Sequence, residues 1–171
     1  EVSSFSTICN KQCYQELIGL LLSLSIHHEN AKIYIISDSF TKNKIDKLTP
    51  KPKLDIKWYI ELDKYSNMNR DYMEKHLLQT EFQMYKATAI KYALEENDDT
   101  VLIDSDTIIL DKIERYNGYE LGLSPQFIKD RNVQEVGYFN GGFLWTNNKN
   151  VPDRWLFHSK SSRYYDQAAL E

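Results

Sequence analysis

Short strand-like segments alternate with longer helix-like segments over the first hundred residues, and this alternation limits the possible folds more than any other feature of the chain. Segments rich in β-branched and aromatic residues predict strands, and apolar residues recurring every three or four positions predict helices. The expected strands are residues 2–8, 32–37, 54–59 and 101–103, and the expected helices are residues 12–26, 39–48 and 70–94, the last with a break near Thr80. Strands separated by helices of this length form right-handed βαβ units, so we expect a mostly parallel sheet covered on both faces.

The pattern changes after residue 110. Residues 108–110 predict one more short strand, and residues 119–124 and 138–146 are strand-like with no helix expected between them. A final helix is expected over residues 151–161, with Pro152 in its first turn. The predicted fold class is therefore α/β, a Rossmann-like sandwich whose central sheet is mostly parallel and becomes mixed in its second half.

Composition narrows the class of protein. The chain has 171 residues, no linker and no internal repeat, which predicts a single domain over residues 1–171. A net charge of −4 provides no basic field for a nucleic-acid backbone, and no apolar run is long enough to form a transmembrane segment. The only cysteines, Cys9 and Cys13, form no disulfide framework and lack the second ligand pair of a zinc site. We therefore expect buried thiols and a cytoplasmic protein.

The most informative segment is Thr-Val-Leu-Ile-Asp-Ser-Asp over residues 100–106. Asp104 and Asp106 follow an apolar strand, and in open α/β sheets ligands bind at the carboxyl ends of the strands. Two carboxylates at this offset point to one side of an extended chain and repel one another unless a cation lies between them. A hard divalent cation that keeps substrate phosphates as its remaining ligands suits such a pair, and we expect Mn²⁺ or Mg²⁺ at Asp104 and Asp106.

The pair has three other interpretations. Two solvated turn residues would need no function. An EF-hand is excluded because Ile108 and Ile109 stand where that loop requires an oxygen ligand and a glycine. A haloacid-dehalogenase-like phosphatase also has a strand ending in D-x-D-x-T, with Asp104 as nucleophile and Asp106 as acid/base. In that family, however, the motif normally opens the domain.

Further motifs in the same order make the chain resemble metal-dependent glycosyltransferases of the GT-A fold, most nearly the family 8 type that includes glycogenin and bacterial galactosyltransferases. A first strand at residues 5–8 and a basic residue, Lys86, precede the D-x-D. The segment Tyr-Phe-Asn-Gly-Gly-Phe at 138–143 and the Asp-Gln pair at 166–167 follow it. The resemblance covers nearly the whole chain and implies a GT-A sandwich that binds a nucleotide sugar.

The resemblance also implies a role for particular residues. The metal ligands are Asp104 and Asp106. The nucleotide-binding residues are Thr7, Cys9, Asn10, Asp38, Lys86 and Ser105. The donor-sugar residues are Lys86, Asp104, Asn140, Gly141, Gly142, Asp166 and Gln167. The implied reaction moves a sugar from a nucleotide-diphospho-sugar, a UDP-sugar first of all, to a hydroxyl of a glycan, lipid or protein acceptor, and no catalytic residue is assigned.

The chain departs from the family at three places. The family has acidic residues after the first strand, where this chain has Cys-Asn-Lys-Gln at 9–12, and it more often has Arg at the position of Lys86. Its third metal ligand, a histidine, and its diphosphate-binding lysine belong to a later segment, so we expect a C-terminally incomplete domain. A non-catalytic domain that binds a nucleotide or glycan is thus a further alternative. A nucleotidylyltransferase is disfavoured because residues 6–14 contain no glycine for a phosphate loop.

Overall fold

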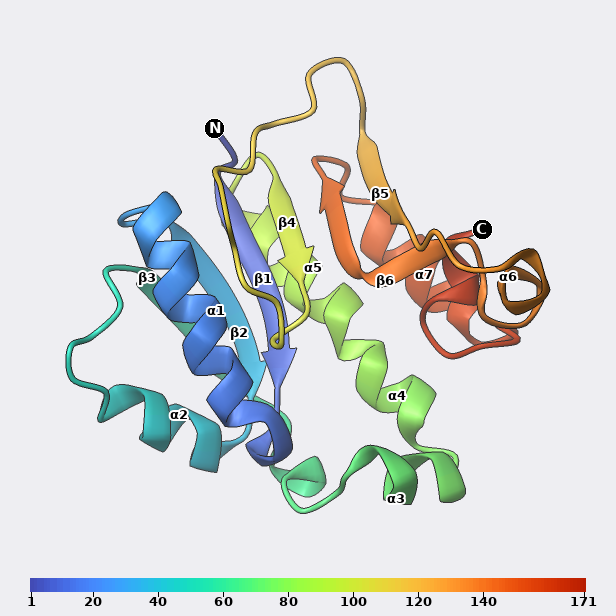
Figure 1. The fold of residues 1–171 in the computed structure, drawn as a ribbon, viewed down its shortest axis with the longest axis horizontal. Helices are drawn as coiled ribbons and strands as arrows, with labels where there is room; N and C mark the ends of the chain where they lie inside the picture. The colour runs from blue at the N-terminus through green and yellow to red at the C-terminus, as the bar shows by residue number, and fades with distance from the viewer.

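A six-stranded sheet forms the centre of the structure, a computed structural model that describes residues 1–171 (Figure 1). The strands are β1 (Ser4–Cys9), β2 (Lys32–Ser37), β3 (Asp55–Ile60), β4 (Thr100–Ile103), β5 (Leu121–Pro125) and β6 (Phe139–Thr146), in the order β3-β2-β1-β4-β6-β5. The first four run parallel, whereas β6 is antiparallel to both β4 and β5. The expected α/β class, with a sheet that becomes mixed in its second half, is confirmed.

Helices cover both faces of this sheet. They are α1 (Tyr14–His27), α2 (Ser39–Asp46), α3 (Arg70–Lys75), α4 (Gln79–Gln83), α5 (Tyr85–Glu96), α6 (Asp130–Val136) and α7 (Val151–Ser159), with short 3-10 turns at Lys11–Cys13, Asp63–Tyr65 and Ala168–Leu170. On one face, four buried leucines of α1 pack against β1, β2 and β4. On the other face, α5 packs against β1, β2 and β4 and also contacts α7. No helix of residues 1–171 combines the length and apolar composition needed to cross a bilayer.

Two predictions about local structure were wrong in the second half of the chain. Residues 108–110 form no strand: Ile109 is buried against α1, and its N–H donates to Ser23 Oγ at 3.0 Å, while the neighbouring apolar side chains are exposed. Both edges of β4, the strand that this segment follows, are already occupied by β1 and β6. A helix, α6, does lie between β5 and β6; it buries none of its residues, so it has no apolar stripe to predict it from.

The expected long helix at 70–94 is divided into α3, α4 and α5. The first break is at Leu77, which has a positive φ of 58°, three residues before the expected break at Thr80. This leucine is 90% exposed, so its side chain contributes nothing to the helical apolar face. The break turns the chain so that α5 alone lies along the sheet (Figure 1).

A buried carboxylate, Asp99, fixes the end of the sheet opposite the carboxyl ends of the parallel strands. It accepts hydrogen bonds from the Ser3 N–H at 2.7 Å and from Trp145 Nε1 at 2.8 Å. Arg115 Nε donates to it at 2.9 Å, which ties the long segment after β4 back to the sheet. Burial alone would raise the pKa of Asp99, but Arg115 and the hydrogen bonds from Ser3 and Trp145 more than offset this and hold the pKa below its ordinary value.

We therefore predict a pH-dependent contribution of Asp99 to stability. A carboxyl group with a lowered folded-state pKa stabilises the fold fully above its unfolded pKa of about 3.9 and loses this contribution as the pH falls through the folded-state value. Asp99→Asn should lower the free energy of unfolding in urea at pH 6, and the gap from the parent should narrow as the pH falls below about 4. Asp153→Asn, at an exposed acid, should show little gap at either pH. A gap for Asp99→Asn that stays constant with pH would contradict this account.

Candidate functional site

The carboxyl end of β4 meets the beginning of β6 because these strands run antiparallel. Ile103 is paired with Phe143, and the Asp104 N–H donates to the Gly142 carbonyl at 2.9 Å. The D-x-D segment and the Asn-Gly-Gly segment are 36 positions apart in sequence, yet they lie side by side at one edge of the sheet. The structure thus brings together two of the segments that the sequence singled out.

A single buried ammonium joins these segments to a third. Lys86, on the first turns of α5, has a side chain that is only 6% exposed. Its Nζ lies 2.9 Å from Asp104 Oδ1 and 2.9 Å from Asp166 Oδ2, and it donates to the Gly141 carbonyl at 3.1 Å. Three oxygen atoms therefore lie within 3.1 Å of the ammonium.

The charge of Lys86 is maintained by its neighbours. Burial alone would lower the pKa of this lysine, because a low-dielectric surrounding disfavours the charged form. The carboxylates of Asp166 and Asp104 outweigh burial and raise the pKa above its ordinary value. Lys86 is thus a fixed positive charge between two negative ones across the neutral pH range.

Both glycines of β6 are required by this arrangement. A Cβ on Gly142 would overlap the Asp104 carboxylate, and a Cβ on Gly141 would lie 2.5 Å from Asp166 Oδ2. The Gly142 N–H also donates to Asn140 Oδ1 at 2.8 Å, which orients the exposed Asn140 side chain at the rim of the site. The predicted donor-sugar residues of β6 therefore surround the two carboxylates closely.

The D-x-D segment itself presents two carboxylates of different exposure. The Asp104 side chain is 39% exposed despite its pairing with Lys86, and Asp106 is exposed. Ser105 between them is buried, and its hydroxyl donates to Cys13 Sγ at 3.6 Å. Within residues 1–171 no third histidine, cysteine or acidic residue joins them in a cluster that suits a metal ion. Two hard oxygen donors fit Mg²⁺ or Mn²⁺, which keep several waters and substrate phosphates in their coordination shells.

The residues expected to bind the nucleotide lie mainly below the surface. Asp38 is buried, caps α2 by accepting from the Thr41 N–H at 2.7 Å, and accepts from the Lys11 N–H at 2.6 Å and the Ser66 hydroxyl at 2.8 Å. Asn10 is also buried and donates to the Tyr65 carbonyl at 3.0 Å. These side chains hold together the loops that follow β1, β2 and β3.

Two more of the expected nucleotide residues, Thr7 and Cys9, are buried in β1. The hydroxyl of Thr7 has no hydrogen-bond partner, and Cys9 lies in the core beside α1. Contacts of Thr7, Cys9, Asn10 and Asp38 with a nucleotide remain predictions.

The side chains of Asp166 and Gln167 make contacts in two different places. Asp166 joins Lys86, and its backbone carbonyl accepts from Trp155 Nε1 at 2.8 Å. Gln167 instead donates to the Val136 carbonyl at 2.9 Å, which ties the C-terminal segment to the end of α6. Sequence reasoning missed the anchoring role of Trp155, since nothing in the helical pattern of α7 distinguishes a tryptophan that also makes a hydrogen bond.

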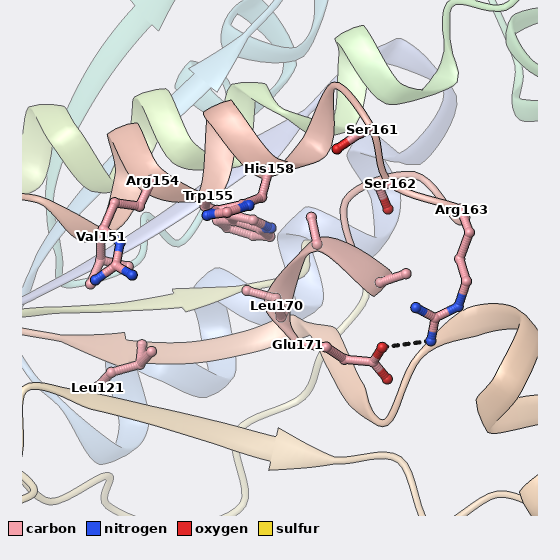
Figure 2. Close-up of a pocket in the computed structure, with 12 residues that line it drawn as sticks. Leu121, Val151, Arg154, Trp155, His158, Ser161, Ser162, Arg163, Leu170 and Glu171 are labelled. Atoms are coloured by element: carbon pink, nitrogen blue, oxygen red, sulfur yellow. Dashed lines mark hydrogen bonds and ion pairs between the residues drawn. The ribbon is translucent and has the colours of Figure 1, made fainter.

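A pocket of about 720 Å³ lies beside this site rather than at it (Figure 2). It is formed by α7, β5 and the C-terminal segment, with Trp155, His158 and Leu170 among its lining residues. Two other lining residues, Arg163 and Glu171, form an ion pair 2.6 Å long. None of the residues predicted to bind the metal, nucleotide or sugar lines this pocket.

Comparisons with known proteins identify the fold. Neither a protein-family model nor a curated protein sequence matches the chain. The galactosyltransferase LgtC, solved in complex with donor and acceptor sugar analogs, superposes on 98% of this chain and 69% of its own, with a TM-score of 0.66 and 15% identity. The bifunctional glycosyltransferase WbbM in its apo form matches 99% of this chain and 37% of its own, with a TM-score of 0.64 and 12% identity.

A third match is the glycosyltransferase GlyE of Streptococcus pneumoniae TIGR4, with a TM-score of 0.60, 17% identity, and coverage of 99% of this chain and 42% of its own. The chain therefore spans about two thirds of LgtC and well under half of WbbM and GlyE. At these identities the likeness shows the fold, which is the GT-A fold of glycosyltransferases. The expected resemblance is confirmed at that level.

We predict that Lys86 is a main determinant of stability at this site. Lys86→Met would leave two carboxylates facing one another without a cation, and breaking a buried ion pair on one side costs about 3–5 kcal/mol. Lys91→Met is the matched control on the same helix: its exposed pairing with Asp153 is worth about 0–1 kcal/mol. Urea unfolding followed by circular dichroism measures both free energies. Equal losses in the two variants would contradict the assignment.

Proposed function

We propose that this chain is the donor-binding domain of a metal-dependent glycosyltransferase that moves a sugar from a nucleotide-diphospho-sugar, a UDP-sugar in the first place, to an acceptor hydroxyl. The main support is the group formed by Lys86, Asp104 and Asp166 beside Asn140, at the edge of the sheet where α/β folds bind ligands. The GT-A fold further supports the proposal, because the solved structures that share it with this chain are glycosyltransferases. The acceptor is a glycan, a lipid or a protein, and the proposed compartment is the cytoplasm, where free thiols such as those of Cys9 and Cys13 persist.

Asp104 and Asp106 would hold the divalent cation. When bound, Mn²⁺ or Mg²⁺ supplies Lewis-acid stabilisation of the negative charge that develops on the departing nucleoside diphosphate. Two observations support this role: Lys86 fixes one oxygen of Asp104, and both Asp104 and Asp106 remain accessible to solvent. Lys86 would thereby orient Asp104 as a metal ligand, while Lys86 itself stays buried.

Asn140 and Asp166 would bind the sugar. The exposed amide of Asn140 offers a donor and an acceptor for sugar hydroxyls, and Asp166 offers an acceptor held in place by Lys86. Because Gly141 and Gly142 have no side chain, the backbone of β6 can lie close to the carboxylates of Asp166 and Asp104. The Asp166 side chain is only 10% exposed, so the exposed Asn140 amide would make the outer contact with a ligand rich in hydroxyl groups and Asp166 the inner one.

The phosphatase alternative assigns Asp104 as a nucleophile. The D-x-D motif follows β4 in the structure, whereas in that family the motif normally opens the domain, and this order disfavours the phosphatase. Turnover of p-nitrophenyl phosphate that disappears in Asp104→Asn would support the phosphatase instead. A domain that binds donors without chemistry would bind UDP and Mn²⁺ and release no UDP from any UDP-sugar, even with its natural C-terminal continuation.

The metal assignment predicts a selective loss in Asp106→Asn. Mn²⁺ with UDP should raise the melting temperature of the parent protein, since a ligand that binds only the folded state stabilises it. Asp106→Asn should abolish most of that increase without lowering the melting temperature of the ligand-free protein. Asp111→Asn, at another exposed acid of the same segment, should retain the full increase. If Asp106→Asn retains it as well, the cation is bound elsewhere.

The sugar assignment predicts a different selectivity in Asn140→Ala. Loss of the amide leaves donor hydroxyls unpaired, at a cost of about 1–3 kcal/mol, which corresponds to roughly 5- to 150-fold weaker binding of the UDP-sugar. Binding of UDP itself should hardly change, and both affinities are measured by calorimetry over a panel of UDP-sugars. Asn147→Ala, at the far end of β6, is the control and should alter neither. Equal losses for UDP and UDP-sugar in Asn140→Ala would show that Asn140 is only a structural residue.

A further inference from the structure

The two cysteines of the chain form a close pair at the carboxyl end of β1. Cys9 is the last residue of β1 and is fully buried, whereas Cys13 immediately precedes α1 and is only partly buried. Their Sγ atoms lie 3.5 Å apart. A disulfide bond is about 2.05 Å long, so the two sulfurs need to approach by roughly 1.5 Å to bond.

Cys13 has the environment of a reactive thiol. The hydrogen bond from Cys9, and further ones from Ser105 and from the backbone near Asn10, outweigh burial and lower the pKa of Cys13 to about 7. It also stands at the N-terminus of the 14-residue helix α1, where a negative charge is favoured. A partly exposed thiolate beside a second thiol is the arrangement typical of oxidation-sensitive pairs.

Cys9 is placed to react second. Its pKa is raised, first by its hydrogen bond to Cys13 and then by burial and by the charge of Cys13. Two of these three causes disappear once Cys13 no longer bears a thiolate. No histidine, aspartate or glutamate joins the pair in a cluster that would hold a metal ion, so zinc is not the partner of these sulfurs.

We propose that Cys9 and Cys13 are an oxidation site that closes to an intramolecular disulfide in the presence of a hydroperoxide. The Cys13 thiolate attacks one oxygen of hydrogen peroxide, the O–O bond breaks, and hydroxide leaves, which converts Cys13 to a sulfenic acid. Cys9 sulfur then attacks Cys13 sulfur and displaces the hydroxyl group, which takes up the proton of Cys9 and leaves as water. In total two thiols are oxidised, one peroxide is reduced, and a thiol reductant reverses the change.

Formation of the disulfide would also affect Ser105, which lies between Asp104 and Asp106. The buried Ser105 hydroxyl donates to Cys13 Sγ at 3.6 Å and also interacts with Cys9. When the disulfide forms, neither sulfur can carry a negative charge, so the hydrogen bond from Ser105 becomes weaker. Loss of this charged acceptor should loosen the Asp104–Asp106 segment. An effect on donor binding rests on the proposed function, whereas the disulfide and the loosening do not.

Mass spectrometry of one peptide tests the site. Cleavage after Glu1 and Glu16 releases residues 2–16, which contain both cysteines and no methionine. With the folded protein in mild hydrogen peroxide, this peptide should lose the mass of two hydrogen atoms and regain it with dithiothreitol. In Cys9→Ser the peptide should gain one oxygen and react with dimedone, and in Cys13→Ser it should stay unmodified. A parent peptide that gains oxygen without losing two hydrogens, or Cys13→Ser oxidised as readily as the parent, would overturn the proposal.

Hydrogen exchange tests the loosening without any ligand. In the oxidised parent the amides of residues 104–107 should exchange roughly fivefold faster, as expected for the loss of a contact of about 1 kcal/mol. Residues 143–146 of β6 should not change, and peroxide-treated Cys13→Ser should match its untreated form at both places. Unchanged exchange at 104–107 in a protein shown by mass to contain the disulfide would overturn the coupling to Ser105. Neither the mass measurement nor hydrogen exchange uses a nucleotide. Both therefore test the disulfide even if the proposed function is wrong.

Discussion

A positive charge buried between two carboxylates organises the carboxyl edge of this sheet. Lys86 Nζ lies 2.9 Å from both Asp104 and Asp166, and its charge is held by them against the effect of burial. An unpaired ammonium or an unpaired carboxylate at this depth would cost several kcal/mol. The three residues come from α5, from the end of β4 and from the C-terminal segment, so both ion pairs form only when all three elements are in place.

The arrangement of the sheet makes the contacts of Lys86 with Asp104 and Asp166 possible. Because β6 runs antiparallel to β4, its beginning lies beside Asp104, and its two glycines leave room for the carboxylates of Asp104 and Asp166. At the opposite end, the buried Asp99 ties the segment after β4 to the sheet through Arg115. The D-x-D segment is thus fixed on one side by Lys86 and continues into a strand-free stretch that is anchored to α1 at Ile109 and to Asp99 at Arg115.

Much of the fold could be predicted from the sequence because it depends on local pattern. The apolar runs of β2 and β4 and the leucine spacing of α1 are sufficient to predict parallel strands covered by helices. The segment at 108–110 misled the prediction because its β-branched residues resemble a strand, and pairing depends on which edges are free. The helix α6 could not be predicted, since it buries no residue and has no apolar face.

Parts of the candidate site could also be predicted from local sequence, and other parts could not. The D-x-D and Asn-Gly-Gly segments could be found because each combines special residue types over a few positions. The pairing of Lys86 with both Asp104 and Asp166 spans 80 positions and depends on tertiary packing, so sequence predicted the three residues individually and not their contact. Asp38 and Asn10 were expected at a nucleotide, and their side chains also hold the loops after β1 to β3, a structural use that no local pattern reveals.

We propose above all that a divalent cation and a nucleoside diphosphate meet at the Asp104–Asp106 segment. Calorimetric titration of UDP, GDP and CMP, each with and without Mn²⁺, tests this claim most directly. We expect UDP to bind at least about tenfold more tightly with Mn²⁺, a gain of about 1.4 kcal/mol, and CMP, which lacks the second phosphate, to gain little. An affinity for UDP that is the same with and without Mn²⁺, or CMP binding as tightly as UDP, would contradict it.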